Sequence, residues 1–216
     1  MTRNHCAFAA LCAALALIVT AGCSSMSQPF PEKALFAIDA GQPDGPVADG
    51  CPYALRVRTL RVAEPFDGRA FVYRLGPSQY KTDYYSGFVG SPDQLLTGEM
   101  IGYLAESRLF AAVMDSAGEG DHQYVLDGSV SELCGDYAKA GSPKAVVAAR
   151  IFLFDDRQAI TRVVFQKAYR KEAPLDGATP EALAAGLGVA YGQLLAELTA
   201  DLSKARPWPS TRPAAR

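Results

Sequence analysis

The chain has 216 residues, a formal net charge of −2 at pH 7 and an apolar fraction of 49%. This slightly acidic balance argues against a nucleic-acid partner, which would require a basic surface. The length fits one compact domain, with ten tyrosines and ten phenylalanines available for its core.

The N-terminal segment has the layout of a bacterial export signal. Arg3 precedes an apolar run from Cys6 to Val19, and the small residues Ala21 and Gly22 stand directly before Cys23. The run is shorter than the roughly 20 apolar residues that a membrane-spanning helix needs. We therefore expect cleavage before Cys23, and we expect no later segment to cross a membrane.

Ala21, Gly22 and Cys23 resemble a bacterial lipobox, in which the cysteine is acylated and becomes the new N-terminus. Thr20 departs from the pattern, which prefers an aliphatic residue there, and the alternative is an ordinary secretory signal cut near Ala21. The resemblance implies that acyl chains such as palmitate on Cys23 attach the mature chain permanently to a membrane. Ser24 then implies delivery to the outer membrane, on the sorting rule of enterobacteria. The expected location is the cell envelope, facing the periplasm.

This interpretation divides the chain into four parts. Residues 1–22 are the signal peptide, 23–33 a polar tether, 34–204 the domain and 205–216 a disordered tail rich in proline. Removal of the signal also removes Arg3, which leaves 20 basic and 23 acidic residues in the mature chain.

Two thiols remain after maturation, because Cys6 and Cys12 leave with the signal and Cys23 is acylated. In an oxidising compartment, this pair, Cys51 and Cys134, favours one disulfide. Cys51 lies just before one predicted strand and Cys134 just after another, so antiparallel neighbours would bring them together. The alternative is two buried, unpaired cysteines.

Alternating and β-branched residues predict most of the domain to be strands. The ranges 53–62 and 69–75 are expected to lie close together, and the last two ranges are expected to form a hairpin. The segment 79–88, between the third range and the first helix, is aromatic. In chain order the predicted strands are 34–39, 53–62, 69–75, 109–114, 122–133, 144–154 and 159–170.

Two helices are predicted. Ser91-Pro92-Asp93-Gln94 combines an N-cap, a proline at the first position and a capping-box residue, and begins a helix that continues to about Arg108. Thr179-Pro180-Glu181 begins the second, whose apolar stripe extends from Leu183 to Leu202. The expected fold is α+β, with a mixed, largely antiparallel sheet and two amphipathic helices packed on one face.

Both helices carry small residues at four-residue spacing. Gly98 is followed by Gly102, and Gly188 by Gly192. Glycine inside a helix costs about 1 kcal/mol relative to alanine. We interpret these positions as points of close helix–helix or helix–sheet approach, in preference to a ligand site.

No group of residues predicts catalysis. His122 is the one histidine of the mature chain, and Ser129 and Ser131 near it lie outside a Gly-x-Ser-x-Gly motif. Asp155-Asp156 is interpreted as a turn between strands and not as an acid/base pair. Phosphate-binding glycine motifs are absent from the sequence. We expect no enzymatic activity, no cofactor and no bound metal.

The arginines of the early strands and the aromatic segment each have two interpretations. The arginines either are ordinary solvated charges on an exposed strand face, or form a basic stripe that faces anionic lipid or a protein partner. The aromatic residues between Tyr80 and Phe88 belong to the core, or contact lipid. The arginines are Arg56, Arg58, Arg61, Arg69 and Arg74.

The lipobox is followed by four segments whose layout resembles the ABC-type transport auxiliary lipoproteins, the PqiC-like partners of mammalian-cell-entry (MCE) lipid transport systems. The resemblance spans Ala34 to Lys204, and it departs from the family at 84–88, where a Trp often precedes the first helix. The matching segments are Leu35-Phe36-Ala37-Ile38, Leu55-Arg56-Val57-Arg58, Arg69-Ala70-Phe71-Val72-Tyr73-Arg74 and Leu104-Ala105-Glu106-Ser107-Arg108-Leu109-Phe110.

This resemblance implies a non-enzymatic component of an envelope lipid transporter. It would be held at a membrane by its lipid anchor and would bind an MCE-domain protein, while a separate subunit uses ATP. The chain could also assemble with further copies of itself into a homo-oligomer. The alternatives are an outer-membrane assembly or peptidoglycan-synthase-activating lipoprotein and, third, an envelope hydrolase.

Overall fold

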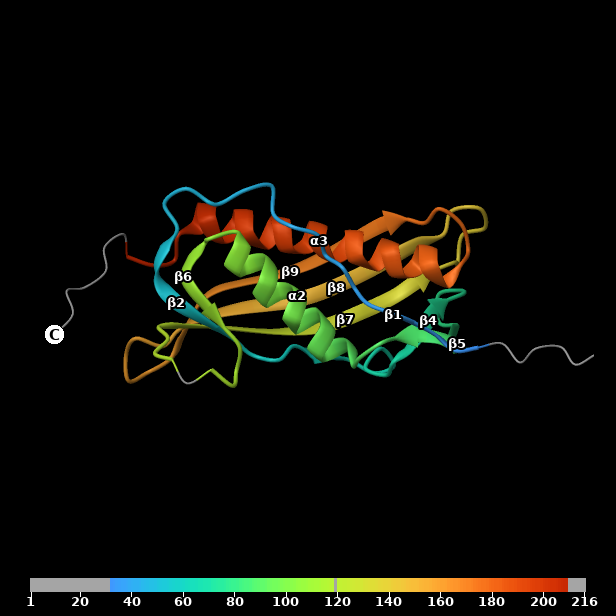
Figure 1. Cartoon of the computed structure of the whole chain (residues 1–216), viewed down its shortest axis with the longest axis horizontal. Helices are drawn as coiled ribbons and strands as arrows, with labels where there is room; N and C mark the ends of the chain where they lie inside the picture. The colour runs from blue at the N-terminus through green and yellow to red at the C-terminus, as the bar shows by residue number, and fades with distance from the viewer. Residues whose placement is uncertain (1–31, 119, 210–216) are drawn as a thin grey trace, which may run out of the picture. The chain divides into compact units, whose positions relative to one another are not determined.

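The computed structural model describes residues 32–118 and 120–209, so Cys23 and the signal peptide lie outside the described residues. The unit that begins at Lys33 combines a sheet with two helices (Figure 1). Its strands are β1 (Ala34–Phe36), β2 (Cys51–Val57), β3 (Arg61–Val62), β4 (Ala70–Arg74), β5 (Tyr80–Phe88), β6 (Phe110–Met114), β7 (Tyr124–Asp136), β8 (Lys144–Asp155) and β9 (Arg162–Pro174). Its helices are α2 (Pro92–Glu106) and α3 (Pro180–Ala205).

The long strand β7 organises the sheet. On one edge it pairs antiparallel with β8, which pairs antiparallel with β9, so the predicted hairpin of the last two strands is confirmed. On the other edge β2, β3 and β4 follow one another in parallel with β7, at residues 124–126, 129–130 and 135–136. The sheet therefore has two long hairpin-linked strands on one side of β7 and three short ones on the other.

The outer strands complete a nine-stranded mixed sheet. β6 pairs in parallel with β2, β5 antiparallel with β4, and β1 in parallel with β5. Of the eight strand pairings among the described residues, five are parallel, so the prediction of a largely antiparallel sheet is wrong. The ranges 53–62 and 69–75 do not pair with each other either, because they lie end to end along β7.

The two helices begin where the sequence predicts, with different caps. Thr179 accepts a hydrogen bond on its side-chain oxygen from the backbone N–H of Ala182, as an N-cap does. The side chain of Ser91 makes no such bond, so the predicted capping box is not formed. The backbone oxygen of Ser91 instead accepts from Leu95 N in the first helical turn.

Both helices pack on the sheet and on each other. α3 contacts β7, β8 and β9, whereas α2 contacts β3 and β6. The buried hydroxyl of Tyr191 in α3 donates to the Leu96 carbonyl of α2 at 2.8 Å. The core between these layers is apolar and fully buried, and includes Leu55, Phe71, Leu126, Leu133, Ile151, Leu187 and Leu194.

One helix among the described residues, α3, is long and apolar enough to cross a membrane by length and composition alone. Of its most apolar window, 56% is buried inside the fold. The same test is passed by core helices of globular domains, and the leucine stripe of α3 faces the sheet that it contacts.

The chain packs against the sheet just beyond α3. Trp208 is buried, and its ring centroid lies 5.3 Å from that of Phe110 and 6.3 Å from that of Tyr124. The first residues of the predicted tail, which begins at residue 205, thus lie against the sheet, because the large indole of Trp208 is buried there. Residues 210–216 lie outside the described residues.

Candidate binding surface

The two cysteines predicted to form a disulfide are free. Cys51 begins β2, where Leu55 pairs with Tyr124 at the start of β7, whereas Cys134 lies near the end of β7. Because β2 and β7 are parallel, about 14 residues of strand, or roughly 45 Å, separate the two thiols along the sheet. A disulfide requires Cα atoms within about 7 Å, so the prediction of a Cys51–Cys134 bridge is wrong.

Both thiols are buried, and burial raises the pKa of each to about 11. They therefore stay protonated near neutral pH and are poor nucleophiles. This outcome is the alternative that the sequence left open.

The sheet has a face that the helices leave uncovered. On β9 the Tyr169 hydroxyl donates to Asp201 of α3 at 3.0 Å and Tyr169 is buried, so this side chain points toward the helix. Side chains alternate along a strand, and Gln166, Ala168 and Arg170 are exposed on the opposite side. We call this opposite side the outer face.

An ion-pair cluster occupies one end of the outer face. Arg74 of β4 binds Glu132 and Asp136 of β7 at 3.1 and 2.7 Å, and Arg170 of β9 binds Glu132 at 2.8 Å. The hydrogen bond from Arg74 lowers the pKa of Asp136. Cys134 lies among these charged groups on the same strand, and their long side chains account for its burial on a face without helices.

Next to this cluster the outer face is hollowed, with a volume of about 600 Å³. Residues of three adjacent strands, β7, β8 and β9, form the hollow. Its lining is Ser129, Ser131, Ala148, Ala149, Arg150, Phe152, Ala168, Tyr169 and Arg170.

The register explains why the hollow exists. Arg150 lies opposite Ser129 on one side and Ala168 on the other, so both neighbours in its row are small. Nothing long enough to cover the guanidinium stands beside it, and Arg150 is exposed. No ion pair of Arg150 occurs within the described ranges. The hollow therefore combines an uncompensated cation with the half-buried ring of Phe152.

The open edge of β9 runs beside the hollow. Within residues 32–118 and 120–209, β9 pairs only with β8, so its other edge has no strand partner. An edge of this kind presents backbone N–H and C=O groups that a further strand can pair with.

Most arginines of the predicted basic stripe have internal partners. Arg58 and Arg61 bind the Asp127 carboxylate at 3.3 and 3.1 Å, and Arg74 belongs to the ion-pair cluster described above. Arg56 donates to the backbone oxygens of Gly118 and Gly120. The stripe is therefore largely neutralised by its own fold, unlike Arg150, which the sequence reasoning missed because Arg150 is one charge in an apolar strand.

His122 and the acidic pair lie at the other end of β7. His122 Nε2 is 3.5 Å from Asp156 Oδ2, and no hydrogen bond joins it to Ser129 or Ser131 in the described part of the chain. The side chain of Asp155 binds Arg157, whose guanidinium lies over the rings of Tyr53 and Tyr124 at 5.0 and 5.3 Å. These contacts hold the β8–β9 turn against the sheet.

The hydrogen bond from Arg157 lowers the pKa of Asp155, which keeps the carboxylate ionised in its structural pairing. No cluster of three or more potential metal ligands occurs among the residues that the structure describes.

The aromatic segment forms β5, and its two ends differ. Phe88 is buried with its ring centroid 4.9 Å from that of Phe71, so this end belongs to the core. Tyr84 is 73% exposed and Tyr85 is 38% exposed. The core interpretation of this segment thus applies to Phe88, and the exposed Tyr84 and Tyr85 are the residues to which the lipid-contact interpretation could apply.

No family model matches the chain, and no curated protein matches its sequence. Solved structures match its fold. Protein XCC0632 from Xanthomonas campestris, described under the family DUF330, is 20% identical, with a TM-score of 0.72 over 80% of this chain and 96% of that protein. An uncharacterized protein is 17% identical, with a TM-score of 0.63 over 79% and 99%. The hypothetical protein CT253 from Chlamydia trachomatis is 11% identical, with a TM-score of 0.52 over 72% and 98%.

These similarities show a shared fold. Each of the three proteins is covered almost to its full length, so the described unit corresponds to a whole domain in each of them.

Proposed function

We propose that this chain is a lipid-anchored lipoprotein of the cell envelope whose periplasmic domain binds an MCE-type partner through the outer face of its sheet. The proposed binding surface rests on one observation, the hollow in which Arg150 is exposed and unpaired between Ser129 and Ala168. The proposed anchor rests on the lipobox-like residues before Cys23.

The hollow suits a protein partner with an acidic side chain next to an apolar one. The guanidinium of Arg150 offers a planar, two-pronged donor to a carboxylate, and the ring of Phe152 offers apolar area beside it. Arginine and aromatic residues are the types that contribute most to binding free energy at protein interfaces. The open edge of β9 adds backbone donors and acceptors along the rim of the hollow.

The anchor contributes by mass action. A domain that is tied to the membrane meets a partner there at a high effective concentration, which raises the apparent affinity without any new contact. A modest interface on the outer face is then sufficient. The domain itself performs no chemistry on this proposal, and ATP is used by another subunit.

The choice of an MCE-type partner rests on the resemblance to the auxiliary lipoproteins and is supported by the fold shared with the DUF330 structure. Its role would be to hold or dock the lipid channel so that lipids pass between the membranes.

Co-purification tests this function. The tagged full-length chain is extracted from membranes with detergent as wild type, Arg150→Glu and Lys139→Glu; Lys139 is an exposed cation of the β7–β8 loop, outside the hollow. We expect an MCE-domain protein to co-purify with the wild type and Lys139→Glu, and its yield to fall about tenfold or more with Arg150→Glu, since losing about 1.4 kcal/mol lowers affinity tenfold.

Two results would contradict the proposal. Equal recovery of the partner with Arg150→Glu and Lys139→Glu would remove the hollow as the binding site. Recovery of an outer-membrane assembly protein or a peptidoglycan synthase in place of an MCE-domain protein would favour the alternative class of lipoprotein.

A further inference from the structure

An exposed apolar patch lies at the end of the sheet where the domain begins. Leu35 of β1 is 59% exposed, and Tyr84 and Tyr85 of β5 stand beside it. Together with the basic residues Lys33 and Arg69 they line one shallow hollow of about 270 Å³. We call these five residues the edge patch.

The fold leaves the edge patch open for a specific reason. Leu35 pairs in register with Gly87, which offers no side chain to cover it. Gly87 cannot be replaced by a larger residue without strain, because a Cβ there would overlap the Arg69 backbone oxygen. The exposure of Leu35 thus follows from the close approach of β4 and β5.

The tyrosines are held in place before any ligand arrives. The Asp83 carboxylate accepts hydrogen bonds from the backbone N–H groups of Tyr85 and Ser86 at 2.8 and 3.1 Å, and from the hydroxyl of Tyr73 at 2.7 Å. Tyr84 and Tyr85 contact each other edge to face, with ring centroids 4.9 Å apart. Asp83, the acidic residue that lines the same hollow, is therefore occupied by internal hydrogen bonds.

The position of the edge patch along the chain identifies what covers it. Cys23 precedes Lys33 by ten residues, and ten fully extended residues span at most about 35 Å. On the anchor part of the proposed function, the Lys33 end of the domain thus stays within that distance of the bilayer. Lys33 lies over the ring of Tyr84 at 5.1 Å, so the charge and the ring sit together.

We infer that the edge patch rests on the membrane that holds the lipid anchor. The headgroup region of that bilayer is what contacts the patch. Tyrosines are enriched at that depth because their rings are apolar and their hydroxyls are polar. Lysine and arginine place their apolar stems among the lipids and their charges at anionic headgroups. Leucine supplies an apolar side chain that reaches below them.

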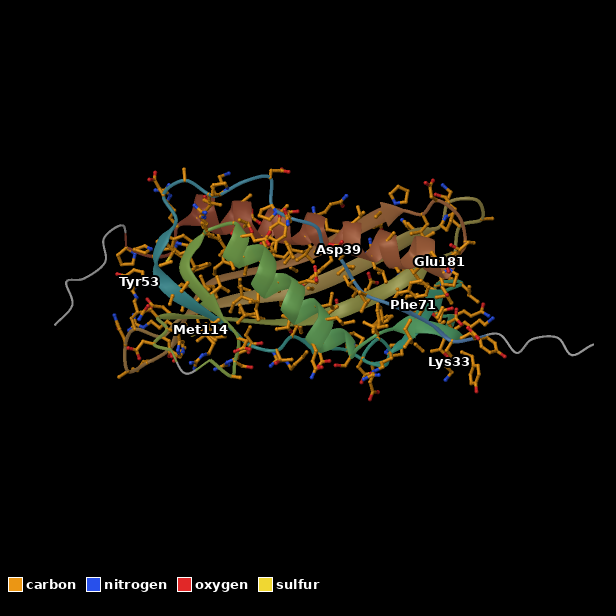
Figure 2. The ribbon with its side chains drawn as sticks, viewed as in Figure 1. Lys33, Asp39, Tyr53, Phe71, Met114 and Glu181 are labelled. Carbon is orange, nitrogen blue, oxygen red and sulfur yellow. The ribbon has the colours of Figure 1, made fainter. Side chains whose placement is uncertain are left out.

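This contact would orient the domain. The edge patch lies level with about Glu132 of β7, because Leu35 pairs with Gly87, Gly87 pairs with Ala70, and β4 runs parallel to β7. The turn containing Ile160 follows the end of β8 that pairs with Tyr124. About eight residues of β7 separate these two levels, which corresponds to roughly 25 Å of strand. Figure 2 shows Lys33 and Tyr53 at opposite ends of the described unit. The Ile160 end would point into the periplasm.

Fluorescence quenching by lipid tests the inference. The acylated full-length protein is reconstituted into vesicles of phosphatidylethanolamine and phosphatidylglycerol, with and without bromine on the acyl chains. Tyr84→Trp adds an indole in the edge patch, and Ile160→Trp adds one at the other end, where Ile160 is 69% exposed. The native Trp208 is buried beside Phe110 and gives the baseline.

We expect brominated lipid to remove more than half of the fluorescence that Tyr84→Trp adds, and to leave that of Ile160→Trp unchanged. Intact mass first confirms the acyl chains, so a missing anchor is recognised separately. An acylated Tyr84→Trp protein that brominated lipid does not quench overturns the inference, and a blue-shifted but unquenched signal assigns the patch to a second copy of the chain. Equal quenching of both variants also overturns it.

Discussion

The backbone oxygen of Asp39 lies against Gly188 of α3 so closely that a Cβ on this glycine would overlap it. One turn later the Ala40 oxygen lies against Gly192 in the same way. The segment that follows β1 therefore crosses directly over the helix backbone. The N–H of Ala40 also donates to Glu99 of α2 at 2.9 Å, so the segment is tied to both helices.

Gly188→Ala should lower the free energy of unfolding by about 1 to 3 kcal/mol, because the added methyl group forces the crossing segment away from α3. Gly102→Ala is the matched control, since nothing lies within 4 Å of a Cβ at that helical position. It should be neutral or stabilise the protein by up to about 1 kcal/mol through helix propensity. Urea denaturation of both variants measures the difference, and an unaffected Gly188→Ala would contradict the crossing.

The helix starts, most strand ranges and a close approach at Gly188 were predictable, because they depend on local patterns: caps, alternation, and small residues at four-residue spacing. The partner at Gly188 was not predicted, since a loop segment after β1, and not a helix or the sheet, lies against it. At Gly98 and Gly102 the same spacing was misleading. Nothing lies within 4 Å of a Cβ at either position, because the segment after β1 reaches α2 through the long side chain of Glu99 and not by backbone contact.

The direction of the strands and the location of Trp208 were not predictable from such patterns. Strand pairing depends on which segments meet across the fold, and β2, β3 and β4 pair with β7, which lies far along the chain. The disulfide prediction failed for the same reason, because it assumed antiparallel neighbours. Arg150 became a candidate only when the register showed small residues on both sides of it.

The thiols of Cys51 and Cys134 should not react with a thiol reagent near neutral pH in the native protein. Burial raises the pKa of each to about 11, so neither forms much thiolate or meets the reagent. In denaturant without reductant, both should react, giving two thiols for each mature chain, since an acylated Cys23 has none. Finding no reactive thiol in denaturant would restore the disulfide.

Tyr73→Phe should weaken the fold in a pH-dependent way. Burial alone would raise the pKa of Asp83, but hydrogen bonds from Tyr73 and from two backbone N–H groups lower it overall. The stability that this carboxylate contributes is therefore present above its unfolded pKa of about 3.9 and is lost as the pH falls through the lower, folded pKa.

We expect Tyr73→Phe to lower the free energy of unfolding by about 1 kcal/mol near neutral pH, and by less in acid, where Asp83 is protonated. Tyr80→Phe is the control, because the Tyr80 ring contacts Phe66 while its hydroxyl has no hydrogen bond in the described part of the chain. Urea titrations near neutral pH and in acid compare the free energies of unfolding of Tyr73→Phe and Tyr80→Phe. A loss that stays constant with pH would show that the bond to Asp83 is not responsible.

His122→Ala should leave function in the cell unchanged. The side chain lies 3.5 Å from Asp156 near a strand end and makes no hydrogen bond to a serine of the described chain. A deletion strain should become sensitive to detergent, and His122→Ala should restore resistance as well as wild type does. Failure of His122→Ala alone would reopen the hydrolase interpretation.

Cys23→Ser, expressed at the native level, should not restore resistance to detergent in the same deletion strain, since the domain loses its tether.

Site-specific photocrosslinking in living cells tests the central claim most directly. A benzophenone amino acid replaces Ala168 in the hollow of the outer face or, as a control, Val189, which is 53% exposed on α3. We predict that the Ala168 position forms a crosslink to a protein that mass spectrometry identifies as an MCE-domain protein, and that the Val189 position does not. No such crosslink from Ala168, or equal crosslinks from both positions, would contradict an anchored domain that binds through its outer face.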